Sequence, residues 1–463
     1  MRVLSLATTV AAAVSSVVVV DAKIKRILHF SDVHLNISAS FDAAESAAMP
    51  FHYGADAPVA LLESALDYAK RVLPNPDFVL YTGDHAAHGQ FSDDYIKHAV
   101  DTNVRTFEKY FPVDSQKRLE VTAVIGNADG NPDYYMDVTD PNKAANPSIE
   151  LISQVWNSSL SKSNFDSFNR RGYLSYDLDA KLAVLTLNTV PYSPSHTPDT
   201  SANPDPFHQF AWLNATLLQL RQNDRFAYIA GHIAPFIDSY GGQPQWHEHY
   251  IKSYKAIVSS YADVIKAQFF GHVHSVEFRV PVDLADDDDA LQQVPLFVTG
   301  SVSPLFGNNP SFMVWEYDAE TYEVVDFIVH GTNISKTAPQ LAWKPLFQAR
   351  KAYNIESLSS TALEELALRM QADPALLEDY YWNMKAQSYR LPPCDHAACR
   401  AQILCTMKWW STRGEYLACV NSVRFSYSVM TRIGTSAGAP MPYSGIIKSA
   451  DARERDYEDV FPM

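Results

Sequence analysis

The apolar residues between Lys23 and about residue 340 fall into short runs separated by polar loops. The runs lie at 27–30, 78–81, 121–125, 182–187, 226–230 and 268–270. Nearly continuous short runs are typical of strands that are buried on both faces of a sheet. Residues 61–72, between the first two runs, have helical spacing instead. The alternation predicts an α/β fold of layered helices and sheets, with closing strands at Phe297, 312–317 and 324–329.

The pattern becomes helical beyond about residue 340. Thr361 and Glu364 form a capping-box pattern beside apolar positions that share one helix face. Asp373 and Pro374 provide an N-cap and a first helical residue for a second helix. From about Asn421 the chain contains Gly, Pro and Ser with little periodicity. We therefore predict a signal peptide, a main α/β domain, a helical subdomain and a loosely ordered tail at 1–22, 23–340, 341–425 and 426–463.

The first 22 residues have the pattern of a targeting segment. Arg2 precedes an uncharged stretch at 3–20, and Ala22 places a small residue before Lys23. A cleaved signal peptide fits better than an uncleaved anchor, because the stretch is only mildly apolar. No later segment of the sequence is long and apolar enough to cross a bilayer, so we expect no permanent membrane span. We expect the protein to be secreted or to reach the endolysosomal or vacuolar lumen.

Sequons and cysteines are compatible with this route. The four glycosylation sequons begin at Asn36, Asn157, Asn214 and Asn333. The four cysteines, which lie within 26 residues and can link only one local region, are Cys394, Cys399, Cys405 and Cys419. An oxidising compartment favours disulfides over free thiols or a zinc knot. Four cysteines allow three connectivities.

The composition excludes several classes of protein. Of 463 residues, 47% are hydrophobic and 19% are charged, so the chain is not mainly disordered. The 53 acidic residues outnumber the 37 Lys and Arg residues, which gives a formal net charge of −16. Because general nucleic-acid binders are usually basic, we expect no nucleic-acid-binding surface.

Residues that can ligate metals follow five of the apolar runs or their neighbours. The groups are Asp32-Val33-His34, Gly83-Asp84, Gly126-Asn127, Gly231-His232 and Gly271-His272-Val273-His274. Ligands of α/β sheets gather at the carboxyl ends of strands. Any one of these groups alone is more often a turn or a core histidine, but five in this order favour a shared site.

The ligand types predict a centre with two divalent ions. They offer carboxylate, amide and imidazole donors and no thiolate. One carboxylate can bridge two ions, and a spacing of roughly 3.5–4 Å suits in-line attack on phosphorus. Such ions neutralise phosphoryl oxygens and generate hydroxide near neutral pH. The sequence therefore predicts hydrolysis of a phosphate ester.

The same motifs resemble those of the calcineurin-like metallophosphoesterase superfamily. More narrowly, the chain resembles the acid sphingomyelinase-like phosphodiesterases over roughly residues 24 to 420. The narrower match rests on Gly83-Asp84-His85-Ala86-Ala87-His88, Asp205-Pro206, Gln209-Phe210, Trp212-Leu213, Gln268 to His272, Ser303-Pro304, Asn308-Asn309-Pro310 and the cysteine region. The resemblance implies a layered αββα sandwich followed by a helical subdomain with disulfides.

The resemblance also implies roles for individual residues. One metal would be held by Asp32, His34, Asp84 and His274, and the other by Asp84, Asn127, His232 and His272. Zinc is the implied ion, although O/N ligation also admits Mn or Fe. The implied disulfides are Cys394–Cys399 and Cys405–Cys419. His88 matches an active-site histidine of the family.

One departure from the family concerns proton transfer. The family usually has His and then an acid after Gly-Asn, whereas this chain has Ala128 and Asp129. The missing imidazole usually protonates the leaving group, and Asp129 would lack the partner that it normally orients. His88, and secondarily His85, are the candidate donors.

Tyr134 and Tyr135 either shape the substrate pocket or pack in the core.

The sequence leaves several functions open. We expect a metal-dependent phosphoric diester hydrolase of the sphingomyelinase-like type. Endopolyphosphatases of the superfamily also lack His at the position of Ala128, so a phosphoanhydride hydrolase is one alternative. A catalytically impaired protein that binds a phosphorylated ligand is another. The expected partners are small phosphodiesters, nucleotides, polyphosphate or phospholipids.

Overall fold

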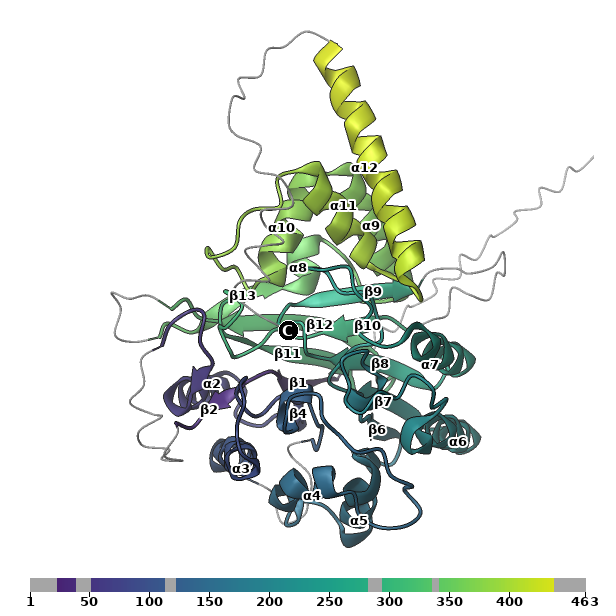
Figure 1. The fold of residues 1–463 in the computed structure, drawn as a ribbon. Helices are drawn as coiled ribbons and strands as arrows, with labels where there is room; N and C mark the ends of the chain where they lie inside the picture. The colour runs from purple at the N-terminus through teal and green to yellow at the C-terminus, as the bar shows by residue number, and fades with distance from the viewer. Residues whose placement is uncertain (1–22, 39–50, 113–121, 282–293, 335–340, 437–463) are drawn as a thin grey trace, which may run out of the picture.

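The computed structural model describes residues 23–38, 51–112, 122–281, 294–334 and 341–436. The predicted signal peptide at 1–22 and the end of the predicted tail lie outside these residues. Within them, the chain forms two mixed sheets that are covered by helices, and further helices gather at one end of the molecule (Figure 1).

The first sheet has five strands in the order β13-β12-β11-β1-β4. They are β13 (Lys344–Gln348), β12 (Val324–Gly331), β11 (Ser311–Asp318), β1 (Ile24–Phe30) and β4 (Phe78–Tyr81). The strands β1 and β4 are parallel, and β1 and β11 are antiparallel. A separate pair of two-residue strands, β2 (Leu35–Asn36) and β3 (Ala57–Pro58), is also parallel.

The second sheet has seven strands in the order β14-β9-β10-β8-β7-β6-β5. They are β14 (Lys408–Trp409), β9 (Glu277–Pro281), β10 (Leu296–Val298), β8 (Ile265–Phe270), β7 (Phe226–Ala230), β6 (Leu182–Thr186) and β5 (Leu174–Asp177). The strands β6, β7, β8 and β10 run parallel. Their carboxyl ends therefore lie along one edge of the sheet.

Alternation along the strands assembles the two sheets into four layers. Ile27 of β1 joins Tyr228, Phe269 and Trp315 in a core between the sheets. The neighbours Leu28 and Phe30 point to the opposite face, because successive side chains of a strand alternate. There they pack in a second core with α2 (Val59–Val72) and α3 (Asp93–Tyr110). A third core places α6 (Gln209–Gln222) and α7 (Glu248–Ser260) over the outer face of the second sheet. This is the predicted αββα sandwich.

Short helices complete the first 340 residues. They are α4 (Pro147–Ser153) and α5 (Lys162–Arg171), with 3-10 turns η1 (Asn127–Asp129), η2 (Gln154–Trp156), η3 (Val190–Tyr192) and η4 (Pro206–His208). One sequence prediction, the strand at 121–125, needs correction here. Residues 122–126 of the described chain form no strand, although 121–125 is apolar. The reason is that the Thr122 hydroxyl, and not the backbone, accepts from Tyr81 N and donates to Tyr81 O, each at 2.7 Å.

The C-terminal region is helical, as predicted. It contains α8 (Ala349–Tyr353), α9 (Ser360–Ala372), α10 (Pro374–Met384), α11 (Ala397–Thr406) and α12 (Arg413–Ser436). Asp373 caps α10 as expected, with its carboxylate accepting from two backbone N–H groups. The cap of α9 is Ser359 instead of Thr361, because the helix begins earlier than the capping-box pattern indicated. The disulfides are Cys394–Cys399 and Cys405–Cys419, which confirms the pairing.

The beginning of the predicted loose tail is helical. The helix α12 continues to Ser436, ten residues past the start of the segment 426–463. The first glycine after Asn421 is Gly434 and the first proline is Pro440, so neither residue type interrupts the helix earlier.

The sequons differ in their surroundings. Asn157, Asn214 and Asn333 are exposed, whereas Asn36 is half-buried and accepts a hydrogen bond from Ser38 N. Glycosylation stays a prediction. Among the residues that the structure describes, none of the helices combines the length and apolarity that crossing a membrane requires.

The fold makes a prediction about pH and stability through His29. This side chain is fully buried between the sheets, and burial lowers its pKa to about 3. Trp315 Nε1 donates to His29 Nδ1 at 3.1 Å. A proton added to Nδ1 would therefore point at the Trp315 N–H. Because the unfolded chain takes up this proton near pH 6.5 and the folded chain does not, stability falls as pH drops from 6.5 toward 3.

We therefore expect His29 to remove about 2 kcal/mol of unfolding free energy between pH 7 and pH 5. In a His29→Gln variant the loss over this interval should be smaller by about that amount, measured by urea unfolding at both pH values. His98→Gln is the control, because His98 is exposed on α3. Equal pH slopes for wild type and His29→Gln would contradict the prediction.

Candidate metal centre

Six of the seven predicted metal ligands follow parallel strands of the two sheets, and Asn127 follows a segment without strand structure. Asp32 and His34 come after β1, Asp84 after β4, Asn127 at the start of η1, His232 after β7, and His272 and His274 after β8. Parallel strands direct these loops to the same edge of each sheet. The structure brings all seven side chains into one continuous cluster, which His88 adjoins.

The backbone of the ligand loops is left-handed at most ligand positions. The φ angle lies between 46° and 76° at Asp32, His34, Asp84, His272 and His274. This conformation costs free energy for residues other than glycine, and such strain is found where a site demands a particular side-chain direction. Each of these residues therefore has its position imposed by the surrounding structure.

The motif glycines make the close approach of the loops possible. A Cβ on Gly126 would lie 2.1 Å from Asp84 Oδ1. Gly83 has a φ of +95°, and a Cβ there would lie 2.8 Å from Gly126 N and 3.0 Å from His232 Nδ1. The Gly-Asp and Gly-Asn pairs thus let the loops after β4 and before η1 meet in backbone contact.

The residues predicted to hold the first metal, Asp32, His34, Asp84 and His274, lie together, and we call the space between them the first metal position. His34 Nε2 is 3.1 Å from His274 Nε2 and 3.3 Å from Asp84 Oδ2. Asp32 Oδ1 is 3.5 Å from His274 Nε2. His34 Nδ1 donates to Ala86 O at 3.0 Å, so its Nε2 presents a lone pair to the cluster. A cation would stabilise this convergence of lone pairs and carboxylate oxygens.

The residues predicted to hold the second metal, Asp84, Asn127, His232 and His272, also lie together, and we call the space between them the second metal position. His232 Nε2 is 3.0 Å from both Asp84 Oδ2 and Asn127 Oδ1, and His272 Nδ1 is 3.3 Å from His232 Nε2. His232 Nδ1 donates to Thr82 O at 2.8 Å, which leaves Nε2 as the ligand atom. Asn127 Nδ2 donates to Asp133 Oδ1 at 2.9 Å, which turns the amide oxygen toward His232.

Asp84 connects the two positions. Its Oδ2 lies within 3.3 Å of His34 Nε2 on one side and 3.0 Å of His232 Nε2 on the other. Its Oδ1 accepts from Ala128 N at 2.8 Å, which fixes the carboxylate plane. A carboxylate placed in this way could be shared by two cations.

Burial prepares the ligands for metal binding. It lowers the pKa of His34, His272 and His274 well below the ordinary value, so these rings are neutral, the form that binds metals. Burial raises the pKa of Asp32 to about 7, and the nearby charge of Asp84 adds to the rise. Burial opposes protonation of His232, but ion pairing with Asp84 outweighs it and raises the His232 pKa to about 9. Bound cations would replace these protons.

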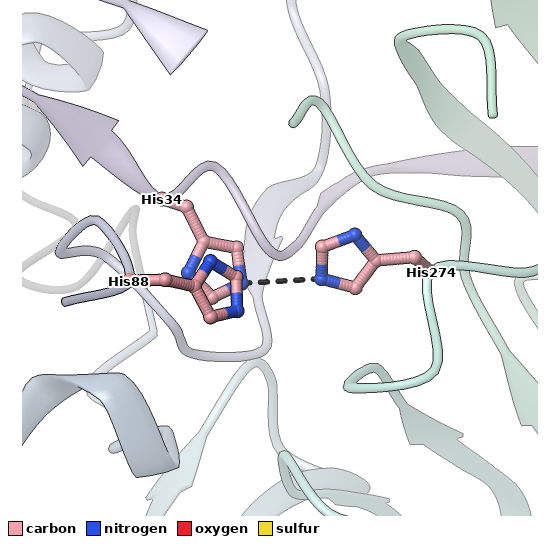
Figure 2. A group of neighbouring side chains, drawn as sticks. All are labelled: His34, His88 and His274. Carbon is pink, nitrogen blue, oxygen red and sulfur yellow. Dashed lines mark hydrogen bonds between the residues drawn. The ribbon is translucent and has the colours of Figure 1, made fainter. Parts of the chain in front are cut away.

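His88 stands beside the first metal position. Its ring stacks on His34 with centroids 3.7 Å apart, and His274 lies across from them (Figure 2). Asp56 fixes His88 by accepting from its backbone N–H at 2.8 Å and from Nδ1 at 3.1 Å. The ring of Phe306 lies nearly perpendicular to the rings of His88 and His274, with centroids 5.8 Å and 4.7 Å away. The His88 side chain is 29% exposed, so a ligand can reach it.

His85, the second candidate donor, has a different environment. It is fully buried, and its ring packs on Tyr81 and Trp156. Its Nδ1 lies 2.9 Å from Asp129 Oδ2, while its Nε2 bonds to no residue that the structure describes. Asp129 therefore does have an imidazole partner, contrary to the expectation from the sequence. The contacts favour a structural role for His85.

Asp129 ties the ligand loops together. Its Oδ1 accepts from His85 N and Ala86 N, and its Oδ2 accepts from Gly126 N. Burial opposes ionisation, but the charge of His85 and these hydrogen bonds outweigh it and lower the pKa of Asp129. The carboxylate thus joins the loop that carries Asp84 to the loop that carries Asn127.

The structure also adds residues that sequence motifs did not reveal. Asp56, Asp133 and Gln245 each hydrogen-bond a side chain of the cluster or His88. None of them belongs to the five sequence motifs, and each reaches the site from a loop outside those motifs. Tyr134, which has a φ of 62°, places its hydroxyl 3.4 Å from His272 Nε2 and so lines the site. The isolated bridge from Tyr135 to Thr197 links neighbouring loops.

A test of the centre uses Asp84. We expect wild-type protein to bind two divalent ions and Asp84→Ala to lose both, because the shared carboxylate serves each position. Elemental analysis after dialysis measures the metal content. The control is Asp101→Ala, which removes an exposed carboxylate of α3. Two tightly held ions in Asp84→Ala, or at most one in wild type, would contradict a shared centre.

The chain matches two family models. Calcineurin-like phosphoesterase matches residues 25–276, and the acid sphingomyelin phosphodiesterase C-terminal region matches residues 294–426. The first match contains the five motif groups that carry the cluster. The second contains the helices α8 to α12 up to residue 426 and both disulfides.

Curated proteins are similar over most of their length. The chain is 28% identical to sphingomyelinase phosphodiesterase D of Dictyostelium discoideum, covering 73% of this chain and 75% of that one. It is 28% identical to acid sphingomyelinase-like phosphodiesterase 3b of Homo sapiens, covering 77% and 78%. It is 26% identical to cyclic GMP-AMP phosphodiesterase SMPDL3A of Homo sapiens, covering 84% and 86%. The calcineurin-like phosphoesterase model matches more than half of this chain, and the chain therefore belongs to the calcineurin-like phosphoesterase family.

Proposed function

We propose that this protein is a phosphodiesterase that uses two divalent metal ions held by Asp32, His34, Asp84, Asn127, His232, His272 and His274. The observation that carries the proposal is the position of Asp84 Oδ2, within 3.3 Å of His34 Nε2 and 3.0 Å of His232 Nε2. Two ions in such a centre neutralise phosphoryl oxygens and lower the pKa of water. The protein fixes the ligand positions through Asp129, Asp133 and the motif glycines.

We propose zinc as the ion at both positions. Four imidazoles with carboxylate and amide oxygens suit zinc, and the same donors admit Mn or Fe. Elemental analysis of protein purified without added metal tests the assignment. Reconstitution of metal-free protein with each ion then compares activity at equal occupancy.

The proposed substrates are small phosphodiesters. The relatives are named for sphingomyelin and for cyclic GMP-AMP, and both compounds contain a phosphodiester. A panel of metal-loaded protein with a phosphocholine lipid, a cyclic dinucleotide, a nucleotide and polyphosphate discriminates these classes.

Ala128 favours a second candidate, hydrolysis of phosphoanhydrides, because an anhydride leaving group needs no proton.

The location of the protein is also proposed. Two disulfides and three exposed sequons support passage through the secretory pathway, with cleavage near residue 22 and delivery to the outside or to an endolysosomal or vacuolar lumen. The division of the chain near residues 340 and 425 remains a proposal as well. N-terminal sequencing of the mature protein tests the cleavage point.

We assign proton donation to His88. Burial disfavours its charged form, but the hydrogen bond and charge of Asp56 outweigh that effect and raise the His88 pKa above its ordinary value. Asp56 is itself held by Ser303 Oγ, which donates to Oδ1 at 3.0 Å. A protonated imidazole that adjoins the first metal position can donate to a leaving oxygen.

Leaving-group chemistry tests this assignment. A proton donor contributes about 10²–10⁴-fold to rate when the leaving group is a poor one. We expect bis(p-nitrophenyl) phosphate to be cleaved far faster than a choline-type alkyl ester. His88→Ala should slow the alkyl ester more than the aryl ester, and Ala128→His should narrow the difference between them. His98→Ala, at an exposed histidine, is the control.

Three results would count against this account. Absence of turnover on every substrate, with two ions bound, would favour a protein that binds a phosphorylated ligand. Equal wild-type rates for alkyl and aryl esters, unchanged by either substitution, would mean that the proton comes from another group. Faster cleavage of polyphosphate than of any diester would favour the phosphoanhydride function.

A further inference from the structure

Gln245 contacts the metal cluster from a loop that the catalytic motifs do not include. Its Oε1 lies 3.0 Å from His272 Nε2. A glutamine oxygen can only accept, so Nε2 of His272 must carry the ring proton. His272 Nδ1 then presents a lone pair on the side where His232 Nε2 lies, 3.3 Å away. Gln245 therefore selects the ring nitrogen that faces the second metal position.

The orientation of the Gln245 amide is itself fixed. Its Nε2 donates to Asp238 Oδ2 at 2.9 Å, so the oxygen must point the other way, toward His272. Asp238 is fully buried, and its carboxylate also accepts from backbone N–H groups of Tyr240, Gly241, Gly242 and Gln243. The loop closes around this carboxylate. Gln245 is further anchored by its own N–H, which donates to Phe236 O at 2.8 Å.

The C-terminal region holds this loop, which we call the Asp238 loop (residues 236–245). Arg413 Nε donates to Gly242 O at 3.0 Å, and Gln402 Nε2 donates to Ser239 O at 2.7 Å. The ring of Tyr416 lies so close to Gly242 that a Cβ there would be 2.6 Å from it. Ile237 packs in a small cluster with Tyr416 and Cys405, whose disulfide partner is Cys419.

These contacts form a continuous path from the second disulfide to one metal ligand. They run from Tyr416 and Arg413 in α12, through the Asp238 loop, to Gln245 and then to His272. In Figure 1, α11 and α12 stand beside the end of the seven-stranded sheet that contains β9. The path reaches only the second metal position, since His272 is the ligand that Gln245 contacts.

We propose that Gln245 is a positioning residue for His272, and that the disulfide-linked C-terminal region sets the affinity of the second metal position by holding the Asp238 loop. This inference rests on the proposed two-metal function. It gives the C-terminal region a role in the metal centre in addition to covering the sheet. Loss of an outer hydrogen bond to a metal-bound histidine typically weakens metal binding about 10–100-fold.

The test measures metal release and does not depend on turnover. Wild type, Gln245→Ala and Gln245→Glu are loaded with Co²⁺, and release to a chelator is followed by the cobalt absorption spectrum. We expect Gln245→Ala to release one of its two ions about 10–100-fold faster than wild type, while the other ion is released at the wild-type rate. Gln245→Glu keeps an acceptor for His272 Nε2, but its second carboxyl oxygen faces Asp238 Oδ2, where the amide donor stood. Two facing carboxyl groups share one proton, which replaces that donor, so this variant should release both ions slowly. The control is Gln222→Ala, which changes an exposed glutamine of α6.

A second variant tests the path at a distance. Tyr416→Ala removes the ring that packs on Gly242 and leaves all metal ligands in place. We expect the same ion to be released several-fold faster, with both disulfides intact by mass mapping. The matched control is Tyr389→Ala, because Tyr389 belongs to the same region and is 80% exposed.

The outcomes separate this inference from the proposed function. If wild type binds fewer than two ions, the two-metal proposal fails and this inference fails with it. If wild type binds two ions and Gln245→Ala releases both at wild-type rates, only this inference is overturned. The inference is also overturned if Gln245→Ala and Gln245→Glu both release their two ions at equally raised rates. Gln245 would then contribute to the packing of the whole site and not to the orientation of His272. If Tyr416→Ala releases both ions at the wild-type rate, the C-terminal region does not influence the second metal position.

Discussion

The site depends on the contacts that the Asp84 carboxylate makes with histidines of both sheets. It follows β4 of the first sheet, yet its Oδ2 contacts His34 from the same sheet and His232 from the second. The contact is possible because the two sheets pack face to face through a common core that includes Ile27, Tyr228 and Trp315. The sandwich thus aligns the carboxyl ends of two sets of parallel strands, and one oxygen spans the junction.

This arrangement is costly for the folded chain. Of the seven polar side chains of the cluster, six are buried and His272 is partly buried, and five of the seven residues adopt left-handed backbone angles. Buried polar groups are tolerated when hydrogen bonds hold them, and here each ligand loop has such a partner outside the cluster. Asp129 joins two loops, Asp133 orients Asn127, and Gln245 orients His272. Bound cations would complete the balance, because they would stabilise lone pairs and charges that otherwise face one another.

The sequence predicted the parts of the molecule that depend on local pattern. Apolar runs located β4 and β7 to the residue, and the five polar groups after or near the apolar runs located the seven side chains that cluster, since both signals are read along the chain. Partners brought by tertiary contact had no such signal. Asp56, Gln245 and the pairing of His85 with Asp129 depend on loops far apart in sequence. Residues 121–125 misled the strand prediction because the Thr122 side chain replaced backbone pairing, which composition does not reveal.

Ala128 occupies the position at which the sequence resemblance implies a histidine, and the contacts around it keep support of the cluster separate from proton transfer. The backbone N–H of Ala128 still donates to Asp84 Oδ1, so the bridging carboxylate keeps its orientation without the imidazole. Asp129, released from orienting that imidazole, bonds to His85 and to three backbone N–H groups and thereby supports both loops. The metal-binding frame therefore persists when the proton donor is absent from its usual position. Under the proposed function, Ala128 would restrict the class of leaving group that the site can release, and the His88–Asp56 pair has the geometry to widen that class.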